Sequence, residues 1–140
     1  MNLTGNTILI TGGATGIGLA LAKRFSNEGN QVIICGRGEA TLQKAKAEEP
    51  ALITHTCDVS DATSRRAMAE WLRINHPELN VLINNAGIQA HRDFTTDPAM
   101  ESLDQEVAIN FTAPIHLIAE LLPLLKQQPQ AYVVNVSSGL

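Results

Sequence analysis

The sequence predicts an α/β fold with a doubly wound parallel β-sheet, and two observations lead to this prediction. Short apolar runs alternate along the chain with longer runs that have helical periodicity. The short runs are apolar throughout, which is typical of strands that helices cover on both faces. Because strand–helix–strand crossovers are right-handed, few topologies remain, and we expect the strand order 3-2-1-4-5.

The expected elements follow one another regularly along the chain. After the first strand, Ile17, Leu21 and Phe25 recur at helical spacing, and Gly29 with Asn30 ends this helix. The second helix is polar and rich in Ala and Lys, and a proline closes it. The strands are expected over 7–10, 31–35, 52–57, 81–83 and 132–136, and the second and fourth helices over about 39–49 and 100–127.

The third and fourth helices differ in their apolar faces. Met68, Trp71 and Leu72 share one face of the third helix, and Ser60 is its expected N-cap. The fourth helix is apolar nearly all round, so it needs cover on more than one side. This pattern predicts a homodimer, or higher self-association, through the 100–127 helix. The unpaired edge of the fifth strand could also cause self-association, by pairing with a strand of another copy of the chain.

Size and charge exclude several classes of protein. The chain has 140 residues, of which 44% are hydrophobic, and this is enough for one domain with a buried core. Its formal net charge is −4, so we expect neither nucleic acid nor an anionic membrane as the main partner. The four histidines are scattered and have no metal-ligand spacing, so no metal site is predicted.

The cysteines and the apolar segments indicate a cytoplasmic protein. Cys35 and Cys57 lack C-x-x-C spacing, and we interpret both as buried, reduced thiols. No secretory signal pattern occurs at the N-terminus. The longest apolar stretch, near 115–125, is interrupted by His116, Glu120 and Pro123, so no membrane span is expected.

A glycine-rich segment joins the first strand to the first helix. Residues 11–18 read T-G-G-A-T-G-I-G. Gly12 can adopt the positive φ of a sharp turn, and Gly16 and Gly18 have no side chain to keep a pyrophosphate from the helix start. The free N–H groups there attract phosphates. No G-K-[ST] follows, so a P-loop is disfavoured. We predict a dinucleotide-binding Rossmann fold, with an ordinary turn as the alternative.

The spacing T-G-x-x-x-G-x-G resembles that of the short-chain dehydrogenase/reductase family. The other motifs of this family follow in order: Asp58-Val59, Asn84-Asn-Ala-Gly87, Asn110 and Asn135-Val-Ser-Ser138. The sequence around residues 35–37, 84–89 and 137–140 most resembles that of the DltE-like bacterial oxidoreductases. The resemblance covers the whole chain. It implies a single NAD(P)-binding Rossmann domain over 1–140 that is truncated after strand five and lacks the last strands.

The resemblance also implies a cofactor site. Asp58 would accept a hydrogen bond from the adenine amino group, although it could instead cap the following helix. Asn84 and Asn85 could be plain turn residues. In the family, however, this segment forms a wall of the cofactor cleft and is hydrogen-bonded to the first strand. Thr11 would supply the hydroxyl group for that hydrogen bond. The predicted cofactor-binding residues are Thr11, Gly12, Gly16, Ile17, Gly18, Arg37, Asp58, Val59, Asn84, Ala86 and Gly87.

Gly36 and Arg37 end the second strand and favour NADP over NAD. An NAD site usually carries a carboxylate here that binds the ribose hydroxyls, and Gly36 removes it. The guanidinium of Arg37 suits a 2′-phosphate, although it could simply be a solvated surface residue. Thr15 stands where many NADP-dependent relatives carry a second basic residue.

The resemblance makes Ser138 and Asn110 the catalytic candidates. Ser138 would donate to a substrate carbonyl, with Ser137 as the competing choice. Pro114, four residues after Asn110, has no N–H, so the Asn110 carbonyl loses its helical partner and the helix should bend there. The freed carbonyl could hold an ordered water that serves the proton relay of the family, or the kink could be harmless.

The family's chemistry also needs a Tyr-x-x-x-Lys pair after the serine. The one tyrosine is Tyr132, and Val stands at position 136. We therefore expect an NADP-dependent carbonyl or alcohol oxidoreductase by lineage that is inactive as this fragment. The alternatives are a nucleotide-binding pseudoenzyme or interaction module, and a remnant that only folds. The substrate is not readable from these residues.

Overall fold

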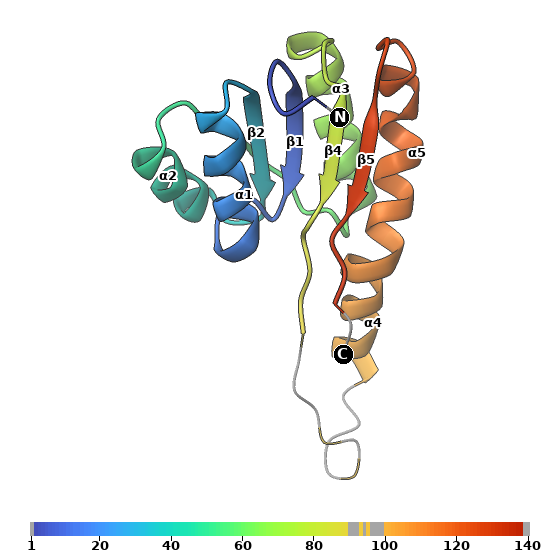
Figure 1. The fold of residues 1–140 in the computed structure, drawn as a ribbon. Helices are drawn as coiled ribbons and strands as arrows, with labels where there is room; N and C mark the ends of the chain where they lie inside the picture. Colours follow the sequence, from blue (N-terminus) through green and yellow to red (C-terminus); the bar gives the residue numbers. More distant parts are fainter. Residues whose placement is uncertain (1, 90–92, 94, 96–99, 139–140) are drawn as a thin grey trace.

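The computed structural model is a five-stranded parallel sheet with helices on both faces (Figure 1). It describes residues 2–89, 93, 95 and 100–138, without the side chains of 100 and 101. The strand order is β3-β2-β1-β4-β5, which confirms the predicted order 3-2-1-4-5. The strands are β1 Thr7–Thr11, β2 Gln31–Gly36, β3 Ile53–Thr56, β4 Val81–Asn84 and β5 Tyr132–Asn135.

The central strand β1 shows why the strands are apolar throughout. Ile8 and Ile10 pack in a core on one face of the sheet, whereas Leu9 belongs to the core on the other face. Each of the three is 0% exposed. Successive side chains of a strand point to opposite faces, so a strand with helices on both sides needs apolar residues at every position.

The helices divide between the two faces. Residues of α1 and α2 line one core, and residues of α3 and α5 line the other. Figure 1 shows α5 running alongside β5. The bounds are α1 Gly16–Asn27, α2 Glu39–Glu48, α3 Ala62–Asn75, α4 Met100–Val107 and α5 Ala113–Leu125, with a π-helical turn η1 over Ala108–Thr112 between the last two.

The predicted N-cap of α3 is wrong by one residue. Asp61 is the N-cap, and its carboxylate accepts a hydrogen bond of 2.6 Å from the backbone N–H of Ser64. Ser60 instead donates its backbone N–H and its hydroxyl to Asp58, at 2.9 and 2.6 Å. Both serine and aspartate are good caps, so the sequence alone does not decide between adjacent candidates.

A π-helical turn interrupts the helix predicted over 100–127. Within it, the N–H of Ala113 donates to the carbonyl of Ala108, five residues earlier. Pro114 has no N–H to offer the carbonyl of Asn110, so an α-helical bond is impossible at this point. The carbonyl of Asn110 therefore loses its α-helical partner, as predicted, and the helix widens into a π-turn here. The bend expected at this point stays a prediction.

The segment Ser102–Leu125 is long and apolar enough to cross a membrane by length and composition. Core helices of soluble proteins meet the same criterion. In this structure one side of α5 packs into the core, through Leu117, Leu121 and Leu124. The absence of a membrane span stays a prediction.

Candidate functional site

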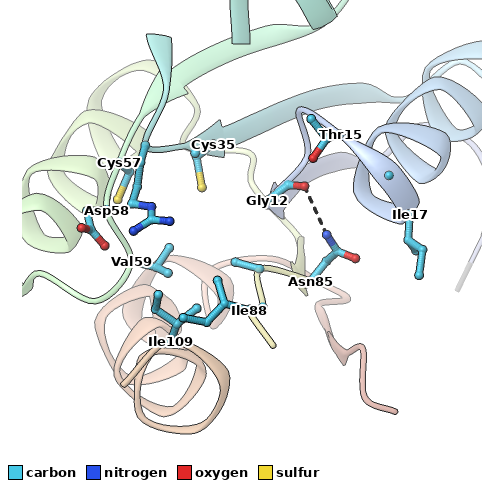
Figure 2. Close-up of a pocket in the computed structure, with 15 residues that line it drawn as sticks. Gly12, Thr15, Ile17, Cys35, Cys57, Asp58, Val59, Asn85, Ile88 and Ile109 are labelled. Carbon is cyan, nitrogen blue, oxygen red and sulfur yellow. Dashed lines mark hydrogen bonds between the residues drawn. The ribbon is translucent and has the colours of Figure 1, made fainter. Parts of the chain in front are cut away.

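A cavity of ≈ 350 Å³ lies at the carboxyl ends of β1, β2 and β4 (Figure 2). The chain reverses its direction of winding between β1 and β4, and open α/β sheets bind ligands at such a point. Eight of the predicted cofactor-binding residues line the cavity. They are Gly12, Gly16, Ile17, Arg37, Asp58, Val59, Ala86 and Gly87.

The turn after β1 has the backbone conformation that the glycines predicted. Gly12 and Gly16 have φ angles of +63° and +53°, which side chains disfavour. A Cβ at Gly16 would meet nothing within 4 Å, so Gly16 leaves its surroundings open beside the start of α1. The N-terminus of a helix offers free N–H groups and a positive dipole end, so this turn can hold a phosphate group.

Gly18 has a packing role that the sequence did not predict. It does not line the cavity, and a Cβ there would lie 2.3 Å from the carbonyl oxygen of Gly12 and 2.5 Å from Nδ2 of Asn85. The small residue therefore lets the turn and Asn85 approach α1. Gly13, which the sequence analysis missed, is small for a similar reason, because a Cβ would lie 2.5 Å from Cγ2 of Ile34.

Thr11 ties the segment after β4 to β1, as the sequence predicted. Its buried hydroxyl oxygen accepts hydrogen bonds from the backbone N–H groups of Asn85 and Ala86, both at 3.0 Å. The side-chain amide of Asn85 returns a bond of 3.0 Å to the carbonyl of Thr11, and it lies 3.3 Å from the carbonyl of Gly12 (Figure 2). Thr11 thus shapes the cavity without lining it.

Asn84 is not a turn residue. It is buried in β4, and its side-chain amide donates a hydrogen bond of 2.8 Å to Oδ1 of Asn135 in β5. It does not line the cavity. The alternative of a plain turn is wrong for this residue, and its contact serves the β4–β5 pairing.

Asp58 lies at the cavity, and it is not the cap of α3, because Asp61 takes that position. Asp58 is among the residues that line the cavity, and its Oδ1 accepts the two hydrogen bonds from Ser60 described above. The backbone N–H of Asp58 donates to Oγ of Ser64 at 3.0 Å. Asp58 therefore organises the entry into α3 and stands at the cavity as well.

The end of β2 leaves open space beside the guanidinium group of Arg37. A Cβ at Gly36 would meet nothing within 4 Å, so packing does not require glycine at this position. In the part of the chain that the structure describes, Arg37 lines the cavity and forms no ion pair. This arrangement can hold an anionic group near the end of β2.

Cys35 and Cys57 form a neutral part of the cavity wall. Both are buried and free of disulfides, as predicted. Burial raises the pKa of each thiol, so both remain protonated at neutral pH. Figure 2 shows Cys35 at the end of β2 and Cys57 directly after β3. Thr15, Gly36 and Asn85, which the sequence already placed near the cofactor, also line the cavity. The lining residues that no sequence pattern indicated are Cys35, Cys57, Ile88 and Ile109.

The two catalytic candidates lie outside this cavity wall. Oδ1 of Asn110 accepts a hydrogen bond of 2.8 Å from the N–H of Ile88, and its Nδ2 donates one of 2.7 Å to the Ile88 carbonyl. Asn110 therefore fastens the segment after β4, whose Ile88 lines the cavity. Ser138 is exposed beyond β5 and is not among the lining residues, and neither is Ser137.

Comparisons with known proteins agree with this geometry. A family model described as short chain dehydrogenase matches residues 6–140. The uncharacterized oxidoreductase DltE of Bacillus subtilis (strain 168) is 51% identical over 141 residues, which cover 100% of this chain and 56% of DltE. Carbonyl reductase (NADPH) 1 of Pongo abelii is 39% identical over 137 residues, covering 93% of this chain and 48% of that protein.

A solved structure extends the likeness to the fold. A metagenomic short-chain oxidoreductase in complex with NADP has a TM-score of 0.88 and 28% identity, covering 99% of this chain and 64% of that one. The chain thus spans about half the length of several curated relatives, such as DltE at 56% and the carbonyl reductase at 48%. With a family match over residues 6–140 and the predicted sheet order, this chain belongs to the short-chain dehydrogenase family.

Proposed function

We propose that this chain is the NADP-binding portion of an oxidoreductase that transfers a hydride between the nicotinamide and a carbonyl or alcohol carbon. The observation that carries the proposal is the glycine turn of positive φ, which opens toward the cavity where α1 begins. Two relatives point to NADP by name, since one is a carbonyl reductase (NADPH) and another was solved in complex with NADP.

The residues of the cavity fit a dinucleotide phosphate. The N-terminus of α1 would bind the pyrophosphate, with Gly16 leaving it space. Arg37 would bind the 2′-phosphate, and Gly36 keeps a carboxylate away from it. Asp58 would accept a hydrogen bond from the adenine amino group. When bound, NADPH supplies the hydride of the reaction.

The catalytic candidates would act on the substrate side. Ser138 would orient the reacting oxygen, and Asn110 would support the proton relay while its side chain holds Ile88. The proton itself needs a tyrosine–lysine pair. The only tyrosine of these 140 residues is Tyr132, in β5, where its hydroxyl donates to Gln130. We therefore propose that the chain by itself binds NADP without catalysing hydride transfer. We also propose that it is located in the cytoplasm.

Calorimetric titration with NADP, NAD and ADP tests the proposal. We expect NADP to bind at least about tenfold more tightly than NAD, because one charge-assisted contact supplies about this factor. Arg37→Ala should remove the preference for NADP and leave NAD binding unchanged. Arg66→Ala, on the exposed side of α3, is the control and should change neither affinity. Absence of binding by the unaltered chain would contradict the proposal.

A second candidate function is that of an interaction module, and the exposed helix face favours it. Apolar side chains stand on the solvent side of the long helix, from Val107 through Phe111 and Ile115 to Leu122. Two measurements separate these functions: the binding of NADP, and the oxidation of NADPH in the presence of a panel of carbonyl compounds. Binding without turnover supports the first proposal, self-association without binding supports the second, and turnover contradicts the proposed inactivity.

A further inference from the structure

An ion pair between a buried arginine and a partly buried glutamate lies behind the wall of the cavity. Arg65 of α3 is only 5% exposed, and its Nε lies 3.5 Å from Oε1 of Glu120 in α5. An arginine is rarely buried unless its charge is partnered, because removing it from water is costly. The position of Arg65 therefore needs an explanation in terms of what the side chain holds.

The shortest contact of Arg65 is with the backbone of the cavity wall. Its Nη1 donates a hydrogen bond of 2.7 Å to the carbonyl of Val59, which lines the cavity. Val59 belongs to one apolar cluster with Ile109 and Ile88, and Figure 2 shows the three near one another in the lower part of the view. The neighbouring Asp58 is held by Oγ of Ser64 at 3.0 Å. The first turn of α3 thus holds this wall at two successive residues.

The pair with Glu120 is not arranged for maximal stability. Within the described residues, Nε of Arg65 and Oε2 of Glu120 are buried without a hydrogen bond. Replacing a buried pair by apolar residues is often neutral for stability, or even stabilising. By contrast, the exposed pair of Arg73 and Glu70 on the same helix is closer, at 2.6 Å. Both charges of the buried pair also affect the pKa of Cys57 in the wall, Arg65 lowering it and Glu120 raising it.

We propose that Arg65 is a positioning residue for the nucleotide: it holds the Val59 carbonyl, and thereby the wall beside the adenine, while Glu120 keeps the guanidinium in place. This inference rests on the proposed binding of NADP. Asp58 and Val59 form the end of the cavity where the adenine would lie, so a displaced Val59 weakens the binding of every ligand that contains adenosine.

Three variants test this role through the affinity for ADP and the temperature of unfolding. Arg65→Met should raise the Kd for ADP about tenfold, because an unheld wall loses a charge-assisted hydrogen bond, and it should lower the unfolding temperature. The double variant Arg65→Met with Glu120→Met removes the unpaired charge, so its unfolding temperature should recover. Its affinity for ADP should stay low, because the Val59 carbonyl still has no donor. Arg73→Met is the matched control and should bind ADP normally.

The outcomes separate this inference from the proposed function. If the double variant regains both stability and ADP affinity, Arg65 has only a structural role and the inference is overturned. Normal ADP binding by Arg65→Met overturns it as well. If Arg65→Met does not fold, the double variant decides. If the unaltered chain binds neither ADP nor NADP, the proposed function fails, and the inference fails with it.

Discussion

Threonine and asparagine side chains hold the loops around the cavity through hydrogen bonds to the backbone. Thr11 receives the two N–H groups that follow β4, and Asn110 makes two bonds with Ile88. Where backbone groups away from a sheet are buried, they need such partners, because an unpaired buried group costs about 1–3 kcal/mol. The bonds to Thr11 are partly buried, whereas those of Asn110 are exposed. Residue types in a motif therefore report here on loop geometry as much as on ligand contacts.

Gly18 gives the sharpest prediction at this scale. In Gly18→Ala, the new Cβ would lie 2.3 Å from the Gly12 carbonyl oxygen, so the turn has to move. We expect a loss of about 1–3 kcal/mol in the free energy of unfolding, which is typical of overpacking. NADP binding should fall with it. Urea unfolding and titration measure the two effects.

Gly36→Ala is the control for this substitution. Gly36 has no contact within 4 Å of its Cβ position and no positive φ, so its unfolding free energy should change little. Equal stability of the Gly18→Ala and Gly36→Ala variants would show that the close approach of α1 to the turn is not required.

At the scale of elements, α3 connects the edge of the sheet to the cavity wall. Its N-terminal turn holds Asp58 and Val59, and its Trp71 stacks on His55 of β3 with ring centroids 4.3 Å apart. The periodicity of Met68, Trp71 and Leu72 predicted the buried face of this helix, because a 3.6-residue repeat reports burial directly. It did not predict the contacts of Arg65, of which the one with Glu120 depends on where α5 lies.

The stacking of His55 on Trp71 predicts a pH dependence of stability. Burial lowers the pKa of His55 in the folded protein, so the unfolded chain binds its proton more readily. The contribution of neutral His55 to stability is therefore present above the unfolded pKa, near about 6.5. It is lost as the pH falls from there through the lower folded pKa.

His55→Gln should therefore flatten the fall of the unfolding temperature with pH below about 6.5. The fluorescence of Trp71, the only tryptophan, should also lose part of its dependence on pH. His116→Gln, at an exposed position of α5, is the control and should behave like the unaltered chain. The same slope in all three proteins would exclude this role for His55.

At the scale of the whole molecule, apolar surface remains on one side. Val133, Val134 and Val136 at β5 are each about 40% exposed, and Phe111 and Ile115 of the long helix are 67% and 53% exposed. The nearly continuous apolar character of residues 100–127 predicted that this helix needs more cover than one sheet offers. Exposed apolar patches of this kind mark interaction surfaces.

We expect the chain to form a dimer through the long helix at micromolar concentration. Ile115→Glu should shift the equilibrium toward the monomer, because two carboxylates would face each other or lose water in the interface. Ile74→Glu is the matched control, since Ile74 is 63% exposed on α3 and should have no effect on association. Sedimentation velocity measures both, and a monomeric unaltered chain would contradict the expected dimer.

Several features were determined by the sequence alone. Apolar runs and helical periodicity predicted the strand order, and the glycine spacing predicted the positive φ of Gly12. These features are local, or follow from the handedness of the chain, so a single sequence carries them. The tertiary structure alone decided why Gly18 is small, which residue caps α3 and what Arg65 holds. Gly18 and Arg65 depend on side chains from distant parts of the chain, Asn85 and Glu120, and no local pattern encodes such distances. The cap of α3 is a choice between two adjacent residue types that both cap well, and only the backbone geometry settles it.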